Sequence, residues 1–350
     1  MATTGCPSAM RVGAGARRAR ASARRSAAVF RGRSIVPVNH LARVAAGRGA
    51  WEHRRSAIRA NVGDAPDIDR LWDFGDPAAS EARFRALAPS LADRPEPAAE
   101  LLTQIARAQG LQRRFEEAAA TLDRVAVALE TGGSPRLRAR YLLERGRLEN
   151  SAGRPELASP RFAEAFDVAE AAGEDALAVD AAHMLGISEP PGPALAWTLR
   201  ALELAERSEQ PAARAWRASL LNNIGWARHD AGEHEAALGC FERALALRRA
   251  SGSEEDVRVA RWCVARERRA LGDACGALAE QRALAAELEA AGERDGYVLE
   301  EVGECLLALG REDEARPWLA RAHALLAADP WLAEREPERL ERLRRIGSGA

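Results

Sequence analysis

The sequence predicts an all-α protein built from repeated helix pairs. Apolar residues make up 47% of the 350-residue chain, chiefly Ala and Leu, whereas aromatic residues make up only 5%. This composition suits helices that pack through small side chains and argues against a β-sandwich. Alanine also recurs at an interval of about 40 residues, which indicates an internal repeat. The matching alanines lie at positions 118, 158, 194, 237, 277 and 315.

The stretch 220–247 shows one repeat most clearly. Its apolar residues recur at helical spacing within two short segments, which places them on one face of each of two helices. These residues are Leu221, Ile224 and Gly225, followed by Ala237, Phe241 and Ala244. Gly232 provides the turn between the segments, and Gly225 lets the two backbones approach to about 8–10 Å. A pair this small cannot bury its own apolar face, so it needs similar neighbours.

This pattern resembles the tetratricopeptide repeat (TPR), in which Leu-Gly, a turn glycine, Ala, Phe and Ala stand at fixed offsets. The resemblance implies a right-handed α-solenoid of about six helix pairs with N- and C-terminal capping helices. It also implies that the first helix of each pair lines the concave groove. The pairs are expected near residues 97–130, 136–172, 174–207, 211–250, 254–291 and 294–328.

Residues 1–62 form an Arg- and Ala-rich extension that we expect to be disordered. The segment holds thirteen Arg and one acidic residue, Glu52, so its net charge is +12. Three interpretations stay open: a transit peptide, an Arg-rich arm for nucleic acid or anionic lipid, and a non-functional extension from a start assigned too far upstream.

The capping elements are expected at either end of the solenoid, which spans residues 63–350. At the N-terminal end Asp76 can cap a helix that begins with Pro77, and Trp72 and Phe74 cover the first apolar face. At the C-terminal end a single capping helix is expected over residues 331–346.

One turn departs from the repeat pattern. In the third pair, Pro190-Pro191-Gly192-Pro193 shortens the connection between the two helices. Three prolines and a glycine in succession predict a rigid, non-helical corner.

The charge of the solenoid argues against nucleic-acid binding. Residues 63–350 carry 38 Arg and 51 acidic residues, a net charge of −13. Because phosphate contacts dominate affinity for nucleic acids, an acidic solenoid binds them poorly. No apolar run approaches the roughly 18 residues of a membrane span. The expected localisation is therefore cytoplasmic, or an organelle if residues 1–62 act as a transit peptide.

The resemblance also implies which side chains face the groove, since these alternate with the buried positions of each first helix. Trp and Arg are enriched at binding hot spots, so a groove with both is a plausible peptide site. The candidate partner-binding residues are Arg107, Arg147, His183, Asn222, Trp226, His229, Trp262, Arg266, Glu300 and Glu304. The alternative is structural: the tryptophans pack between adjacent helices and the acids form a solvated face. The two-Lys, two-Asn carboxylate clamp of chaperone-binding TPR proteins is not reproduced.

The sequence offers no catalytic, cofactor or metal motif. It lacks GxGxxG, P-loop and GxSxG patterns, and its cysteines contain no CxxC pair. His229 and His234 are five residues apart and do not share a helix face as the HExxH pair does. We therefore expect a non-enzymatic scaffold that binds a peptide or protein segment in its groove. The alternatives are a regulator that changes conformation on binding a small peptide, and an organelle-targeted TPR factor.

Overall fold

The structure, a computed structural model, describes residues 68–251 and 254–349. The expectation for residues 1–62 lies outside these ranges. All regular elements of the described residues are helices, and no strand occurs among them. The predicted all-α fold class is confirmed for this part of the chain.

The described residues contain six helix pairs in chain order, each consisting of a leading helix and a trailing helix. The pairs are α4 (Pro95–Leu111) with α5 (Phe115–Glu130), α6 (Pro135–Ser151) with α7 (Pro155–Ala171), α8 (Asp175–Ser188) with α9 (Pro191–Arg207), α11 (Arg217–Asp230) with α12 (His234–Ser251), α13 (Glu254–Ala270) with α14 (Ala274–Ala290), and α15 (Gly296–Ala308) with α16 (Glu312–Leu326). A one-turn helix, α10 (Pro211–Arg214), precedes the fourth pair.

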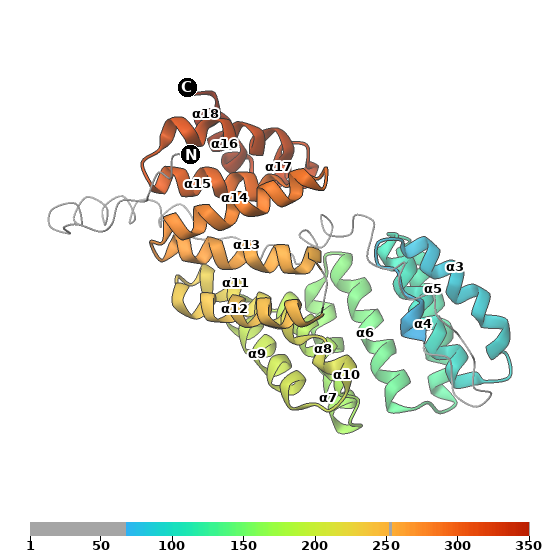
Figure 1. Ribbon diagram of the computed structural model, residues 1–350. Helices are drawn as coiled ribbons and strands as arrows, with labels where there is room; N and C mark the ends of the chain where they lie inside the picture. Colours follow the sequence, from blue (N-terminus) through green and yellow to red (C-terminus); the bar gives the residue numbers. More distant parts are fainter. Residues whose placement is uncertain (1–67, 252–253, 350) are drawn as a thin grey trace. The chain divides into compact units, whose positions relative to one another are not determined.

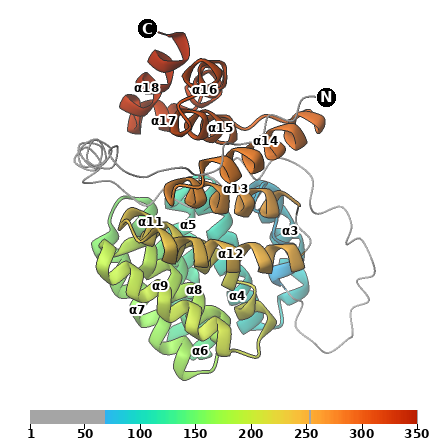
Figure 2. The same cartoon turned by 60° about the vertical axis from the view of Figure 1, so that its left-hand side comes forward.

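The described residues belong to two compact units, which we call the first unit (68–260) and the second unit (261–349). In the first unit every helix from α4 to α9 packs against the next, and α9 packs against α11 (Figure 1). The leading helices α4, α6 and α8 also contact one another in order. In the second unit α15 packs between α14 and α16 (Figure 2).

Small residues in the leading helices let each pair close tightly. A Cβ atom added at Gly225 would lie 2.5 Å from the Phe241 ring, and one added at Gly146 would lie 2.4 Å from Phe162. Both aromatic rings are fully buried. In each pair the ring stands sixteen positions after the glycine, so the same contact recurs in successive repeats. The Gly–Phe spacing seen in the sequence thus has a direct steric cause.

The turns within the pairs depend on a left-handed backbone conformation. Gly153, Gly232, Gly272 and Gly310 have φ between 71° and 99°. Glycine adopts this conformation at no steric cost, and it ends the leading helix. The first pair places Arg113 at the matching position, with φ of 63°. Arg113 therefore carries a backbone strain that the glycines avoid.

The N-terminal cap consists of η2 (Ile68–Leu71), α3 (Pro77–Leu87) and η3 (Ala88–Leu91). The Asp76 side chain accepts a hydrogen bond of 2.9 Å from the Ala79 backbone N–H, which confirms the predicted helix start. Trp72 is buried and packs edge-on against Phe84. Phe74 stacks on Trp72 but remains 54% exposed, so it covers the core only in part.

The C-terminal cap differs from the single helix expected over 331–346. The structure has α17 (Pro330–Arg335) and α18 (Pro337–Ser348), with a break at Glu336. Glu336 adopts φ −130° and ψ 46°, outside the helical region. Pro337 explains the break, because proline disfavours helical geometry in the preceding residue.

The proline-rich turn also corrects an expectation. Pro191, Gly192 and Pro193 form the first turn of α9 rather than a non-helical corner. Of these four residues only Pro190, at the helix N-cap, lies outside the helix, with φ −59° and ψ 158°. Proline is tolerated in a first turn because the N–H it lacks has no partner within the helix there.

Candidate functional site

A network of polar side chains crosses the leading helices of the first unit. We call it the polar ladder and define it as Arg107 on α4, Glu144 and Arg147 on α6, Asp180 and His183 on α8, and Asn223 on α11. Arg147 is its centre. Its Nη1 donates to Glu144 over 2.5 Å, and its Nη2 donates to both carboxylate oxygens of Asp180 over 2.5 and 2.6 Å.

The carboxylates of the ladder are buried, and the surroundings of Asp180 favour its ionised form. Glu144 is 4% exposed and Asp180 is 7% exposed. Burial alone would raise the pKa of Asp180, but the positive charges of Arg147 and Arg107 outweigh it and hold that pKa below its usual value. The pKa of Arg147 is raised, since its two carboxylate partners outweigh the effect of burial. The centre of the ladder is thus a compensated set of buried charges.

Arg107 begins the ladder and has a different environment. Its Nη1 lies 3.8 Å from Glu144, beyond hydrogen-bonding distance. Its guanidinium carbon lies 5.6 Å from the centre of the Trp72 ring and 5.3 Å from that of Phe74. Burial and the nearby charge of Arg147 lower the pKa of Arg107.

His183 continues the ladder as a neutral imidazole. Burial lowers the pKa of His183 to about 4, with further lowering by Arg147 and Arg107 that Asp180 opposes only in part. Its ring lies 5.0 Å from that of Trp216. The Asn223 amide nitrogen lies 3.5 Å from Nδ1 of His183. The ladder thus passes from paired charges to neutral polar groups.

Two further candidates of the first unit, Trp226 and His229, lie together on α11. The Trp226 ring packs against the buried Phe241 at 5.2 Å and against His229 at 5.3 Å. The His229 ring also contacts His234 at 5.2 Å, so the turn brings together two histidines that a single helix would have separated. Trp226 is half-buried and packs on the core of its own pair.

The second unit carries a related cluster around Glu301 of α15. Arg266 donates to Glu301 over 2.8 Å, and Arg269 donates two hydrogen bonds to it over 2.9 and 3.0 Å. Burial alone would raise the pKa of Glu301, but these two cations hold it below its usual value. Arg266 also stacks on the Trp262 ring at 5.5 Å.

The other candidates of the second unit are engaged within it. Arg339 of α18 donates to both oxygens of Glu300, and Arg342 of α18 does the same to Glu304. Trp262 is 7% exposed, and its Nε1 donates to the Tyr297 carbonyl over 3.2 Å. These side chains therefore make hydrogen bonds to other residues of the second unit.

The structure brings candidates together in three groups. Arg107, Arg147 and His183 lie along Glu144 and Asp180. Trp226 contacts His229, and Trp262 contacts Arg266. Asn223, the residue after the predicted Asn222, places its amide nitrogen 3.5 Å from Nδ1 of His183.

Sequence reasoning missed the carboxylates that connect these groups. A signal for them exists, because Glu144 and Glu301 each pair with an arginine about one repeat earlier. Arg107 and Glu144 are 37 positions apart, and Arg266 and Glu301 are 35. A search for opposite charges at this separation would have found them.

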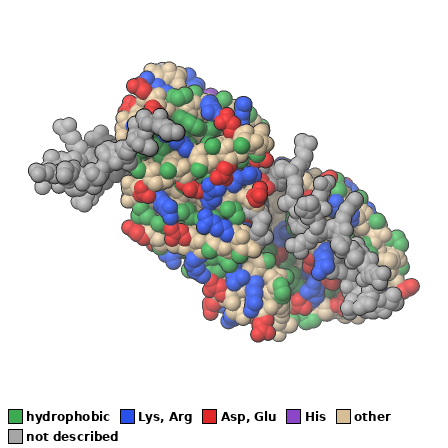
Figure 3. All heavy atoms as spheres, in the orientation of Figure 1, with side chains coloured by type: hydrophobic (Ala, Val, Ile, Leu, Met, Phe, Trp, Pro, Cys, Tyr) green, Lys and Arg blue, Asp and Glu red, His purple; other side chains and the backbone are tan. Residues whose placement is uncertain are grey.

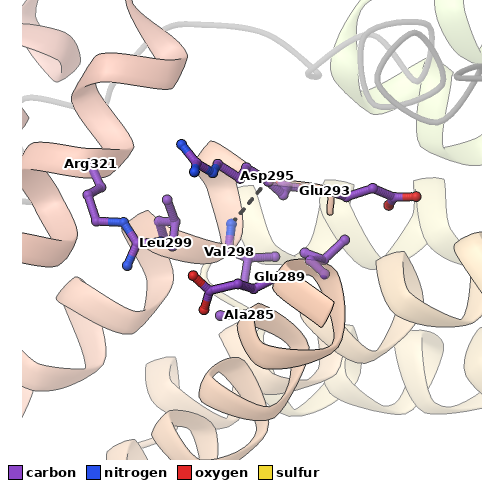
Figure 4. A pocket seen from close by; sticks show the side chains of 9 residues that line it. Ala285, Glu289, Glu293, Asp295, Val298, Leu299 and Arg321 are labelled. Atoms are coloured by element: carbon purple, nitrogen blue, oxygen red, sulfur yellow. Dashed lines mark hydrogen bonds between the residues drawn. The ribbon is translucent and has the colours of Figure 1, made fainter. Parts of the chain in front are cut away.

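A small pocket lies in the second unit between the end of α14, the start of α15 and α16. Figure 4 shows Arg321 and Glu289 on different sides of it, with the backbone N–H of Val298 donating to Asp295. Its volume is about 230 Å³ including open solvent. Its enclosed space is only about 10 Å³, whereas ligand pockets usually measure about 300–1,000 Å³, so this pocket does not qualify as a small-molecule site.

On the face shown in Figure 3, basic and acidic side chains are interspersed over the described residues. None of the helices in residues 68–251 and 254–349 combines the length and apolar character that crossing a bilayer requires.

Comparison with known proteins shows the fold. No family model and no curated protein matches the chain. The apo form of RapI is 11% identical, with a TM-score of 0.60 and coverage of 75% of this chain and 74% of that one. A Rap protein complexed with competence and sporulation factor is 16% identical, with a TM-score of 0.53 and coverage of 81% and 82%. The fold is TPR-like.

A further solved structure carries the repeat in its name. A tetratricopeptide repeat protein from Parabacteroides merdae is 16% identical over 80% of this chain and 97% of that one, with a TM-score of 0.44. Sequence identities this low indicate a shared fold and carry no information about the binding site of this chain.

Proposed function

We propose that this TPR-like protein binds an extended peptide or protein segment along the polar ladder of its first unit. The observation that carries the proposal is the set of buried and half-buried polar side chains that crosses four successive leading helices. Packing alone does not need such a set, because apolar side chains of similar volume stabilise helix contacts equally well. A row of positioned donors and acceptors is what an extended segment needs to satisfy its backbone groups.

The chemistry of the ladder suits such a segment. Arg107 and Arg147 are half-buried donors, and neutral His183 can donate or accept through its ring nitrogens. Asn222 and Asn223, also half-buried, add amide groups one repeat further on. We propose that Trp262, Arg266, Glu300 and Glu304 instead stabilise the second unit, through the ion pairs and the indole hydrogen bond described above.

Exposed apolar side chains complete the proposed surface. Ile187 is 38% exposed and follows Gly186, the same offset at which Arg107, Arg147 and Trp226 follow their small residues. Phe74 is 54% exposed beside Arg107. Apolar anchors surrounded by polar groups are typical of protein-binding surfaces.

The fold is compatible with this role. One solved structure with this fold is a complex with competence and sporulation factor, which supports ligand binding by TPR-like helix pairs. We propose a scaffold that acts by binding rather than catalysis, in the cytoplasm, with a protein or peptide partner and with no contact to nucleic acid or membrane.

The test compares two exposed apolar residues of the first unit in the full-length protein. Ile187→Lys adds a charge on the proposed face, and Val127→Lys adds the same charge on trailing helix α5, where Val127 is 61% exposed. Partners recovered from native lysate should be retained by Val127→Lys and lost by Ile187→Lys, with circular dichroism unchanged in both.

Equal recovery by the two variants would contradict the proposal and move the binding surface elsewhere. The same preparation separates the scaffold from a conformational regulator. A scattering radius that changes when the recovered partner binds favours the regulator, and an unchanged radius favours the scaffold.

A further inference from the structure

Arg107 differs from the other arginine of the polar ladder in having no carboxylate at hydrogen-bonding distance. Arg147 contacts Glu144 and Asp180 within 2.6 Å, whereas the nearest carboxylate oxygen to Arg107 is 3.8 Å away. The Arg107 side chain is 24% exposed, against 4% for Glu144. It is a positioned cation that lies at ion-pair distance from Glu144 but donates no hydrogen bond to a carboxylate.

The neighbours of Arg107 explain why no carboxylate of the first unit accepts a hydrogen bond from its guanidinium. Glu144 is 4% exposed and is already bound by Arg147, three residues later on the same helix. Asp180 is held by two hydrogen bonds from the same Arg147. Both nearby acids are therefore committed, and moving either toward Arg107 would break a buried ion pair.

A fixed aromatic wall stands beside the guanidinium. Trp72 Nε1 donates to Gln104 Oε1 over 2.8 Å, which holds the indole in place. Phe74 stacks on Trp72 with a ring separation of 4.7 Å and an angle of 2° between the planes. Arg107 lies within 5.6 Å of both ring centres, a distance at which cation–π attraction holds a cation in place. Much of Phe74 faces solvent.

The electrostatic environment favours an added anion. Burial and the positive charge of Arg147 lower the pKa of Arg107, Glu144 and Asp180 oppose this only in part, and Arg140 lowers the pKa further. An environment that disfavours a cation is stabilised when a negative group comes to rest against that cation. Arginine also offers paired N–H donors that match the two oxygens of a carboxylate.

We propose that Arg107 and Phe74 form an anchor subsite for a carboxylate next to an apolar side chain in the bound segment. The carboxylate receives two hydrogen bonds from the guanidinium, and the apolar side chain packs on the exposed face of Phe74. The subsite lies between the N-terminal cap and the first helix pair. This inference rests on the proposed function, because it names the chemistry that the polar ladder selects in its partner.

The chain offers a matched control in Arg200 of α9. Its guanidinium also lies over two rings, at 4.7 Å from Phe166 and 6.0 Å from Trp197. Arg200 already donates to both oxygens of Glu170, over 3.2 and 3.0 Å. It has the same stacking as Arg107 but a carboxylate in place, so it should not select an acidic ligand.

The experiment selects random heptapeptides with the immobilised full-length protein. One library displays the peptides internally, and a second displays them with a free C-terminus. The wild-type protein should enrich Asp or Glu next to Leu, Ile, Val or Phe. Enrichment in both libraries identifies a side-chain carboxylate, and enrichment only at the free end identifies a chain-terminal one.

Single substitutions then test which residues cause the preference for an acidic residue and for the apolar residue next to it. Arg107→Gln should bind the best acidic peptide about tenfold or more weakly, and it should no longer distinguish that peptide from its uncharged amide analogue. Arg200→Gln should keep the wild-type affinity and preference. Phe74→Ala should lose the preference for the adjacent apolar residue. If Arg107→Gln melts early, Arg107→Lys tests the charge with its fork geometry removed, and a loss of at least threefold is expected.

Two outcomes overturn different claims. A wild-type protein that enriches no peptide overturns the proposed function and this inference together. Peptides that bind without an acidic preference, or an acidic preference that persists in Arg107→Gln and in Arg107→Lys, overturn the anchor subsite alone.

Discussion

Glu144 in the first unit and Glu301 in the second occupy the same repeat position, two residues before the glycine of a leading helix. Both carboxylates are buried, and each lies near an arginine from the preceding leading helix. The distances differ. Arg266 donates to Glu301 over 2.8 Å, whereas the nearest guanidinium nitrogen of Arg107 lies 3.8 Å from the Glu144 carboxylate. In the second unit Arg266 is hydrogen-bonded to the buried glutamate, whereas in the first unit Arg107 forms no hydrogen bond to it.

The charge of one residue, the one directly after the glycine of each leading helix, accounts for the difference between the two distances. The residue directly after the glycine is Arg147 in α6 and Glu304 in α15. Arg147 binds Glu144 from the same helix and so displaces Arg107. Glu304 cannot do this, and it pairs instead with Arg342 of α18. Glu301 is then left to Arg266 and Arg269. In a repeat scaffold, one charge reversal therefore decides whether a position stabilises the fold or stays available to a ligand.

The largest expected effect is a loss of stability when the Glu301–Arg266 and Glu301–Arg269 ion pairs are broken. Glu301→Gln leaves Arg266 and Arg269 without their buried counter-charge, so we expect a loss of about 3–5 kcal/mol in the free energy of unfolding. Glu144→Gln should cost less, about 1–3 kcal/mol, because Arg147 keeps Asp180. Urea unfolding followed by circular dichroism measures both. Equal losses would show that the two clusters do not differ as their geometry indicates.

Acid should weaken the first unit before the second. The pKa of His183 is about 4 in the folded protein, against an ordinary value of 6.5. The unfolded state therefore binds the proton more tightly, and the stability contributed by neutral His183 is complete above pH 6.5 and is lost as the pH falls toward 4. The shift corresponds to about 3 kcal/mol. The carboxyl of Glu301, with its lowered pKa, stays ionised until lower pH.

Hydrogen exchange at pH 7 and pH 5, corrected for intrinsic rates, measures this difference. Amides of α8 should lose protection at pH 5, while those of α15 should keep it. His183→Gln is the control and should remove the effect in α8. Equal loss of protection in both helices would assign the acid sensitivity to other groups.

Glycine substitutions test how the two units pack. Gly225→Ala places a methyl group against the Phe241 ring and should cost about 1–3 kcal/mol. Gly303→Ala meets Leu319 at 2.4 Å, and its cost should be smaller because an aliphatic side chain can change rotamer. Gly239 on α12 has no atom within 4 Å of an added Cβ, so Gly239→Ala should stabilise by about 0.5–1 kcal/mol. Thermal melting of the three variants gives the order.

The smallest effect concerns the turns. Arg113→Gly should stabilise the first unit by about 1 kcal/mol, because glycine relieves the left-handed conformation that Arg113 adopts. Gly310→Ala at the matching turn of the second unit should destabilise it by a similar amount. A lower melting temperature for Arg113→Gly would show that the Arg113 side chain makes a compensating contact.

Much of the fold could be predicted from the sequence because its signals are local. The Gly–Phe spacing reports a steric contact inside one helix pair, and Gly232 marks a turn that only glycine adopts freely. Asp76 and Pro77 identify a helix start from two adjacent residues. The misplaced boundaries, at Pro191–Pro193 and at Glu336, come from prolines whose effect depends on whether they begin a helix or interrupt one.

For the candidate site, local sequence patterns were only partly informative. The sequence predicts polar and aromatic side chains on the leading helices, because the repeat period puts Arg107, Arg147 and His183 at related offsets. Which charges pair depends on the packing of the helices, since a guanidinium can reach carboxylates on its own helix and on the next one. The choice of Arg147 for Glu144, and of Arg266 for Glu301, depends on distances of about 1 Å between packed helices, which no local pattern in the chain encodes.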